Sequence, residues 1–250
     1  MEQPFVKHSI ENRVCYITFF HPSHNALPSD LLQQLKVKIE WAGATDDVQV
    51  IVLQSGGDRT FCAGASFNEL ILIDDEVAGK AFFLGFAHVI NAMRKCSKPI
   101  IGRVQGKAVG GGVGLAAAAD YCLATQYASI KLSELSIGIG PFVIEPAVTR
   151  KIGVSNMSQM TLNAETFYSA DWAKNNGLFA EVFESIEALD DAVAILAKKL
   201  ASYNPDALQA MKKVIWNNTD HWDELLAERA QISGTLVLSD FTKRVLEGYR

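Results

Sequence analysis

The most informative part of this sequence is the stretch Gln105-Gly-Lys-Ala-Val-Gly-Gly-Gly-Val-Gly-Leu115. It follows an apolar run, Pro99–Val104, that is typical of a strand, and it leads into Val113–Ala119, which is typical of a helix. Consecutive glycines at such a turn allow φ > 0 and let a ligand approach the backbone closely. Their N–H groups are also among the unpaired donors at the positive end of the helix dipole. The stretch predicts either a site for a developing negative charge or a tight turn between packed elements.

Outward from this turn, the chain alternates between predicted strands and predicted helices. Short β-branched or apolar runs predict strands at 14–20, 50–53, 121–124 and 129–132. Apolar residues recurring on one face predict helices at 28–43, 81–93, 187–201 and 206–216, and the chain is mostly helical from about Glu145. This order predicts an α/β core over residues 1–190 and a helical C-terminal region, 191–250, that serves assembly and is not an independent domain.

Composition excludes several classes of protein. Hydrophobic residues make up 49% of the 250 residues and charged residues 20%, which is typical of a globular chain and excludes general disorder. A net charge of −5 argues against a nucleic-acid partner. The cysteines and histidines show no zinc spacing, and we expect no metal. Because neither a signal peptide nor an apolar run long enough to span a bilayer is visible, we expect a cytoplasmic protein without membrane contact.

Two further features could carry chemistry. A second glycine-containing loop, Arg59-Thr-Phe-Cys-Ala-Gly-Ala-Ser66, follows the predicted strand at 50–53. Glu134 is flanked by Leu132, Leu135 and Ile137, whose side chains would partly desolvate its carboxylate and raise its pKa toward the range useful for proton transfer. A helix cap or an ion pair with Lys131 is the alternative role for Glu134.

A dinucleotide-binding fingerprint competes with these interpretations. Gly112-Val-Gly114-Leu-Ala-Ala117 fits the GxGxxA pattern, and Glu134 lies near the spacing at which an acid would meet a ribose. In that motif, however, the first glycine follows its strand almost directly, whereas here Gln105–Gly111 intervene.

In sum, the ordered motifs resemble those of the crotonase family, also called the enoyl-CoA hydratase/isomerase superfamily. They are Asn25-Ala26-Leu27, Phe61-Cys-Ala-Gly-Ala65, Gly106–Gly112, and Ser133-Glu134 ahead of Gly138 and Pro141. The resemblance covers nearly the whole chain. It implies a spiral of ββα turns, a helical C-terminal region used in trimerisation, and a homotrimer or homohexamer.

The resemblance also implies an oxyanion hole made of two backbone N–H groups that hold the thioester carbonyl of an acyl-CoA. Matching the motifs gives Ala63 and Gly111 as these donors, and Glu134 as the catalytic acid/base. Coenzyme A would be part of the substrate, not a separate cofactor, with its adenine along 63–67. The expected substrate-binding residues are Ala63, Gly64, Ala65, Ser66, Phe67, Gly110, Gly112 and Gly114.

Departures from the family pattern bear on the reaction. Gly114 and Phe142 stand where relatives carry acids, which leaves Glu134 as the one acid of the family pattern in this sequence. One base is enough to move a double bond, because it can take a proton from the α-carbon and return it at the γ-carbon. The alternatives are a branched enoyl-CoA hydratase of the 3-methylglutaconyl-CoA type, with Glu145 or an ordered water as partner, and a non-catalytic CoA- or dinucleotide-binding protein. Phe82, Phe83, Phe86 and Phe142 predict either an acyl pocket or an aromatic core.

Overall fold

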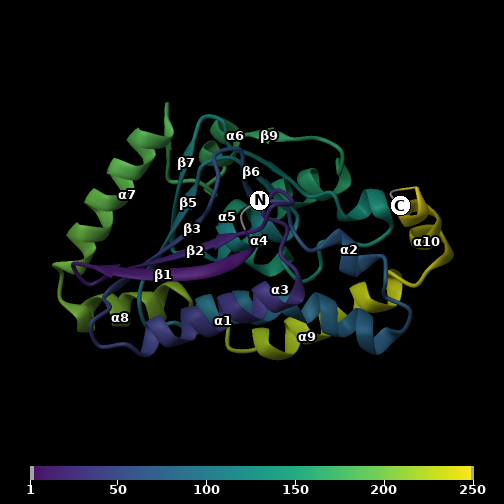
Figure 1. Cartoon of the computed structure of the whole chain (residues 1–250), viewed down its shortest axis with the longest axis horizontal. Helices are drawn as coiled ribbons and strands as arrows, with labels where there is room; N and C mark the ends of the chain where they lie inside the picture. Colours follow the sequence, from purple (N-terminus) through teal and green to yellow (C-terminus); the bar gives the residue numbers. More distant parts are fainter. Residues whose placement is uncertain (1–2, 249–250) are drawn as a thin grey trace.

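A computed structural model describes residues 3–248, which form two β-sheets surrounded by helices (Figure 1). The larger sheet has the order β1-β2-β3-β5-β7-β10, and the smaller has the order β4-β6-β8-β9. The strands of the larger sheet are β1 (Phe5–Glu11), β2 (Val14–Phe20), β3 (Val50–Ser55), β5 (Ile100–Val104), β7 (Tyr121–Thr125) and β10 (Glu181–Phe183). Those of the smaller sheet are β4 (Thr60–Cys62), β6 (Lys107–Val109), β8 (Ser129–Lys131) and β9 (Tyr168–Ser169).

Successive turns of the chain repeat one unit. A long strand joins the larger sheet, a short strand joins the smaller sheet beside the previous one, and a helix follows. The units are β3–β4 with α3, β5–β6 with α4, and β7–β8 with α5. Apart from the antiparallel pairs β1/β2 and β8/β9, neighbouring strands are parallel. This arrangement confirms the predicted spiral of ββα turns.

The helices vary in length from one turn to five. They are α1 (Ser29–Ala44), α2 (Phe67–Leu70), α3 (Glu76–Lys95), α4 (Gly111–Ala118), α5 (Glu145–Leu162), α6 (Ala170–Asn175), α7 (Ile186–Ala201), α8 (Pro205–Ile215), α9 (Trp222–Leu236) and α10 (Asp240–Glu247), together with a 3₁₀ turn, η1 (Glu134–Ile137). Within residues 3–248, none of these helices is long and apolar enough to cross a membrane.

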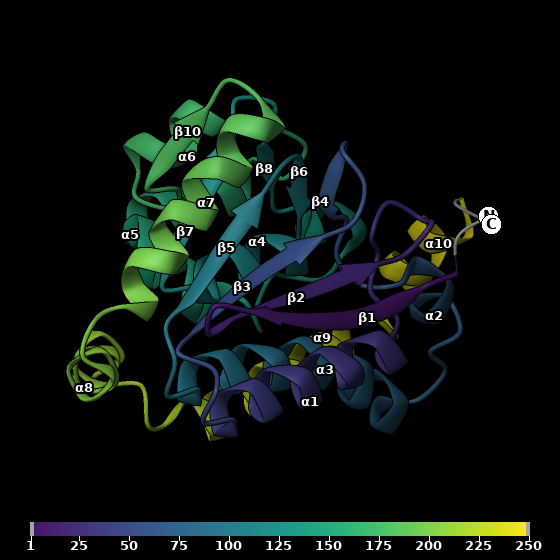
Figure 2. The ribbon, with the colours of Figure 1, turned by 60° about the vertical axis from the view of Figure 1, so that its left-hand side comes forward.

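Helices cover both faces of the larger sheet, which is why its central strands read as continuous apolar runs. In β3, Ile51 and Leu53 face the main core, whereas Val50 and Val52 face α7. Figure 2 shows α7 lying across the sheet, with α1, α3 and α9 below it. The predicted division at 190/191 falls inside α7, which packs on the sheet as one continuous helix.

The helical C-terminal region is bound to the core at two places. Along α9, a methyl group added at Gly79 of α3 would lie 2.7 Å from the carbonyl oxygen of Gly234, so the two backbones cross in close contact. Along α8, the Lys212 ammonium group pairs with the Asp120 carboxylate at 2.8 Å, and both side chains are buried. The region therefore packs against its own chain, and its role in trimerisation stays a prediction.

Candidate active site

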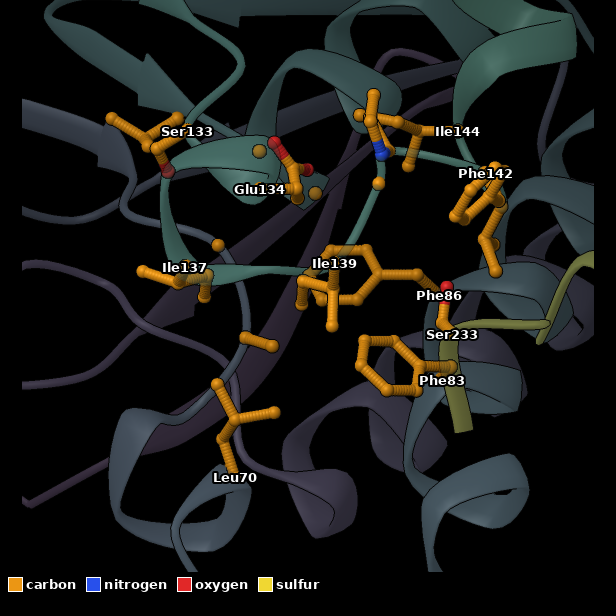
Figure 3. A pocket seen from close by; sticks show the side chains of 18 of the residues that line it. Leu70, Phe83, Phe86, Ser133, Glu134, Ile137, Ile139, Phe142, Ile144 and Ser233 are labelled. Atoms are coloured by element: carbon orange, nitrogen blue, oxygen red, sulfur yellow. The ribbon is translucent and has the colours of Figure 1, made fainter. Parts of the chain in front are cut away.

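A cavity of about 320 Å³ opens where the smaller sheet, α3 and η1 meet, with Ser233 of α9 at its edge (Figure 3). Its walls include both glycine-containing loops that the sequence pointed to. Ala63, Gly64 and Ala65 come from the first loop, Phe67 begins α2 directly after it, and Gly110 and Gly111 come from the second loop. Glu134 lines the same cavity, so the structure brings most of the predicted site residues together.

The first loop is held in place by the Asn25-Ala26-Leu27 segment. The buried Asn25 amide donates to the carbonyl oxygens of Gly56 and Thr60, both at 2.8 Å. Leu27 N–H donates to the Gly64 carbonyl at 2.8 Å, and the Leu27 carbonyl accepts from Ser66 N–H at 3.2 Å. These bonds fix the backbone on either side of Ala65.

Backbone hydrogen bonding distinguishes the N–H groups of this loop. Ala63 N–H donates to the His24 carbonyl at 3.2 Å, so the donor expected from the sequence is already engaged. Ala65 N–H has no acceptor within residues 3–248. Gly111 N–H, at the first residue of α4, also has no acceptor within residues 3–248, as is usual for the first turn of a helix. Two unpaired donors, at Ala65 and Gly111, thus border the cavity.

The two loops touch beside these donors. A methyl group added at Gly64 would lie 3.0 Å from the Val109 carbonyl oxygen and 3.6 Å from Gly111 N. Gly64 has φ +93, which favours glycine. The close approach and the positive φ together explain the glycine in this loop, and they bring the first loop against the start of α4.

The Glu134 carboxylate is poised between its two protonation states at neutral pH. Although part of the residue is accessible, its Oε2 atom is buried and has no hydrogen-bond partner among the described residues. Desolvation by burial raises the pKa of Glu134 to about 7, only partly offset by its own backbone N–H. Such a carboxylate can accept a proton near pH 7 and return it, as a general acid/base must.

Three of the expected substrate-binding residues lie outside the cavity lining, which differs from the prediction. A methyl group added at Gly112 would lie 2.4 Å from the Cys62 carbonyl oxygen, and one at Gly114 would lie 2.4 Å from Ile144 Cγ2. Both glycines allow α4 to pack closely. The Ser66 hydroxyl instead caps α2 by accepting from Glu69 N–H at 3.4 Å. The GxGxxA pattern is therefore used for packing.

The candidate second acid also lies elsewhere. Glu145 begins α5, where its carboxylate accepts from the Thr149 hydroxyl at 2.7 Å and lies 3.8 Å from the Arg229 guanidinium. It does not line the cavity. Phe142, which cannot transfer a proton, does line it. Among the described residues, Glu134 is thus the one carboxylate in the cavity wall.

The remainder of the cavity wall is largely apolar. Figure 3 shows Glu134 toward one end of the group, Leu70 and Phe83 toward the other, and Phe86 and Ile139 between them. The four phenylalanines at 82, 83, 86 and 142 all line the cavity, and Phe82 and Phe86 also belong to the buried core, so both interpretations of these rings fit the structure and their contact with an acyl group stays a prediction.

Sequence reasoning missed some cavity residues. Ser133, Ser136 and Ser233 contribute hydroxyl groups, and among residues 3–248 Lys131 contributes the one basic side chain of the lining. Ser233 lies about one hundred residues beyond Glu134 and reaches the cavity only because α9 packs along α3. No spacing in the sequence signals that contact. Lys131 and Ser133 lie within three residues of Glu134, so their proximity along the chain could have identified them as cavity residues.

Comparisons with known proteins agree with this architecture. The family model for enoyl-CoA hydratase/isomerase matches residues 9–244. The 2,3-dehydroadipyl-CoA hydratase of Escherichia coli strain K12 is 33% identical over 217 residues, covering 83% of this chain and 80% of that protein. The peroxisomal Delta(3,5)-Delta(2,4)-dienoyl-CoA isomerase of Arabidopsis thaliana is 28% identical over 226 residues, covering 84% of this chain and 80% of that protein.

A solved structure shows the same fold. The enoyl-CoA hydratase from Bacillus halodurans superposes with a TM-score of 0.90 over 97% of this chain and 99% of that chain, at 22% identity. Fold, cavity and sequence matches lead to one conclusion. This chain belongs to the enoyl-CoA hydratase/isomerase family, the crotonase superfamily.

Proposed function

We propose that this protein is an enoyl-CoA isomerase that moves a carbon–carbon double bond from the 3-position to the 2-position of an acyl-CoA thioester. The observation that carries the proposal is the presence of one carboxylate, Glu134, in the cavity wall opposite an apolar surface. Double-bond migration needs one group that both removes and returns a proton, whereas addition of water is easiest with two carboxylates.

The unpaired N–H groups of Ala65 and Gly111 would hold the thioester carbonyl oxygen. We assign Ala65 in place of Ala63 because Ala63 N–H already donates to His24. As the α-proton leaves, negative charge develops on that oxygen, and fixed donors stabilise it without reorganisation. Removing one such donor typically costs about 10²–10³ in rate.

Glu134 would carry the proton between carbons. Its carboxylate removes a proton from C2, and the electron pair of that C–H bond forms the dienolate held by the two N–H groups. The protonated Glu134 then delivers the proton to C4 while a double bond forms between C2 and C3. No co-reactant is needed, and the carboxylate is regenerated.

The cavity lining favours an apolar acyl group. Leu70, Phe83 and Ile139 supply apolar surface, and Lys131 is the one basic residue in the lining. The Lys131 ammonium group lies 5.2 Å from the centre of the Phe167 ring, which places this charge beside an aromatic side chain that is not part of the lining. A second carboxylate on the acyl group would lose its hydration where it lies against Leu70, Phe83 and Ile139. We therefore expect unsubstituted or aromatic acyl chains.

Hydration is the second candidate, favoured by the hydroxyl groups of Ser133, Ser136 and Ser233, which could hold a water in the cavity. The 33% identical relative is a hydratase, which also supports it. Against it stands the position of Glu145, whose carboxylate binds Thr149 outside the cavity and cannot act with Glu134.

Replacing Glu134 by Gln tests the proposal. With 3-hexenoyl-CoA as substrate, formation of the conjugated thioester is followed by ultraviolet absorbance, and binding of CoA is measured by calorimetry. We expect E134Q to lose about 10²–10⁴ in kcat while binding CoA as the wild type does. The matched control is E145Q, which should retain full activity. Undiminished turnover in E134Q would show that Glu134 is not the base.

A further inference from the structure

Two lysines and one phenylalanine form a cluster beside the cavity that the proposed reaction does not use. The ammonium groups of Lys107 and Lys131 each lie 5.2 Å from the centre of the Phe167 ring. The two ammonium groups therefore lie on or beside the same ring, no farther apart than twice this distance. Phe167 is 44% exposed, so the ring is accessible to a ligand.

Strand pairing puts these side chains on the cavity side of the smaller sheet. β6 and β8 are parallel neighbours, seen side by side in Figure 2, and Val109 is paired with Lys131. Side chains alternate along a strand, so Lys107 points to the same face as Val109, which lines the cavity. Ala108 and Ile130, which point to the opposite face, are fully buried.

Both cations lack a counter-charge. Within residues 3–248, neither Lys107 nor Lys131 forms an ion pair with a carboxylate. Two ammonium groups near one ring repel each other, and a shared anion would remove that repulsion. The Phe167 ring lies beside both charges, and the solvent-exposed part of its side chain adds apolar contact area for the same ligand.

We propose that Lys107, Lys131 and Phe167 form a phosphate-binding shelf, which holds a phosphate group of the CoA part of the substrate. The inference rests on the proposed function, because it takes the ligand to be an acyl-CoA. CoA carries a diphosphate and a ribose phosphate, and lysine ammonium groups bind phosphate through charge-assisted hydrogen bonds. Lys131 lines the cavity and also contributes to the shelf, so it connects the reacting end of the substrate with its anionic end.

The test compares CoA with pantetheine, which has the same thiol arm but no phosphate. Kd values are measured by calorimetry for the wild type, K107A, K131A and F167A. The matched control is K7A, since Lys7 also lies over a phenylalanine ring, that of Phe5 at 4.1 Å, but on β1. K107R and K131R keep the positive charge, so they distinguish an effect of the lost charge from an effect of misfolding.

For each lysine-to-alanine variant we expect about tenfold weaker CoA binding, unchanged pantetheine binding, and recovery in the arginine variant. K7A should bind both ligands as the wild type does. Unchanged CoA binding in K107A and K131A would overturn the shelf, and so would equal weakening for CoA and pantetheine. A wild type that binds CoA through the shelf but does not isomerise 3-enoyl-CoA would overturn the proposed function alone. If the wild type binds neither ligand, both proposals fail.

Discussion

The carboxylate of Glu134 lies directly against the backbone of Gly110. A methyl group added at Gly110 would be 2.9 Å from Glu134 Oε1 and 3.4 Å from the carboxyl carbon. Gly110 has φ +53, and its N–H donates to the Lys131 carbonyl at 2.9 Å. Gly110 directly precedes Gly111, whose N–H is one of the two unpaired donors. The backbone at Gly110 thus limits how closely the Glu134 carboxylate can approach that donor.

A methyl group at Gly110 should therefore impair catalysis more than binding. G110A would displace the Glu134 carboxylate and strain the backbone, and misplacing a catalytic group by about 1 Å can cost ~10² in rate. We expect kcat to fall by about that factor, with KM changed much less. The measurement is steady-state kinetics with 3-hexenoyl-CoA. A change confined to KM would contradict this view of the Gly110–Glu134 contact.

The rate should depend on pH through Glu134. Because burial raises the pKa of Glu134 to about 7, the carboxylate that we propose as the base is only partly ionised at neutral pH. We expect kcat/KM to rise with pH and to level off above about pH 8, with an apparent pKa of about 7, that of Glu134 in the free enzyme. A profile that stays flat from about pH 5.5 to 8.5 would exclude a base of this kind.

The same carboxylate should make the fold less stable as pH rises. The folded protein holds this proton up to about pH 7, whereas the unfolded chain releases it near the ordinary pKa of 4.5. Between these values the folded state binds more protons, so the free energy of unfolding decreases as pH increases. E134Q lacks this penalty. We expect the Tm of E134Q to exceed that of the wild type by about 5 °C at about pH 8. The difference in Tm between the two proteins should be smallest at about pH 5.

Thermal unfolding of the two proteins across this pH range measures the difference directly. A Tm difference that stays constant with pH would mean that the substitution acts through packing and not through ionisation.

The buried pair of Asp120 and Lys212 should matter for stability and not for catalysis. Asp120 also accepts from Ile100 N–H at 2.7 Å and from the Trp216 indole at 2.6 Å, so removing Lys212 would leave a buried carboxylate without its ammonium partner. We expect K212M to lower the free energy of unfolding by about 3–5 kcal/mol in urea denaturation. The control is K213M, at the exposed neighbouring lysine, which should change it little. Equal stabilities would contradict the role of this pair.

Regular elements were predicted where burial leaves a periodic pattern in the sequence. The run at 14–20 coincides with β2, and the predicted helix at 187–201 differs from α7 by one residue. The strand β1 was missed because only one of its residues, Val6, is buried, so it shows no alternation. The strands β4 and β6 were missed because they lie inside the two glycine-containing segments, 59–66 and 105–115, which the sequence analysis interpreted as loops. α3 begins at Glu76, five residues before the predicted start at Ala81, because Asp75 caps it.

The sequence identified which residue types form the candidate site better than it identified the contacts between them. Glu134 and the glycine loops were found because their residue types are unusual in apolar surroundings. Our assignment of Ala65 in place of Ala63 depends on the Ala63–His24 hydrogen bond, which joins residues thirty-nine positions apart and leaves no local signal in the sequence. Likewise, the packing of Gly114 against Ile144 depends on how α4 and α5 meet.

The central claim is that one carboxylate moves a double bond and does not add water. The most direct test incubates the purified protein in D₂O with 3-hexenoyl-CoA and, separately, with crotonyl-CoA. Gain of water is followed by mass spectrometry, and formation of the conjugated thioester by ultraviolet absorbance. We predict that 3-hexenoyl-CoA is converted to 2-hexenoyl-CoA without gain of water, and that crotonyl-CoA is not hydrated. Rapid gain of one water by crotonyl-CoA, with 3-hexenoyl-CoA left unchanged, would contradict the account.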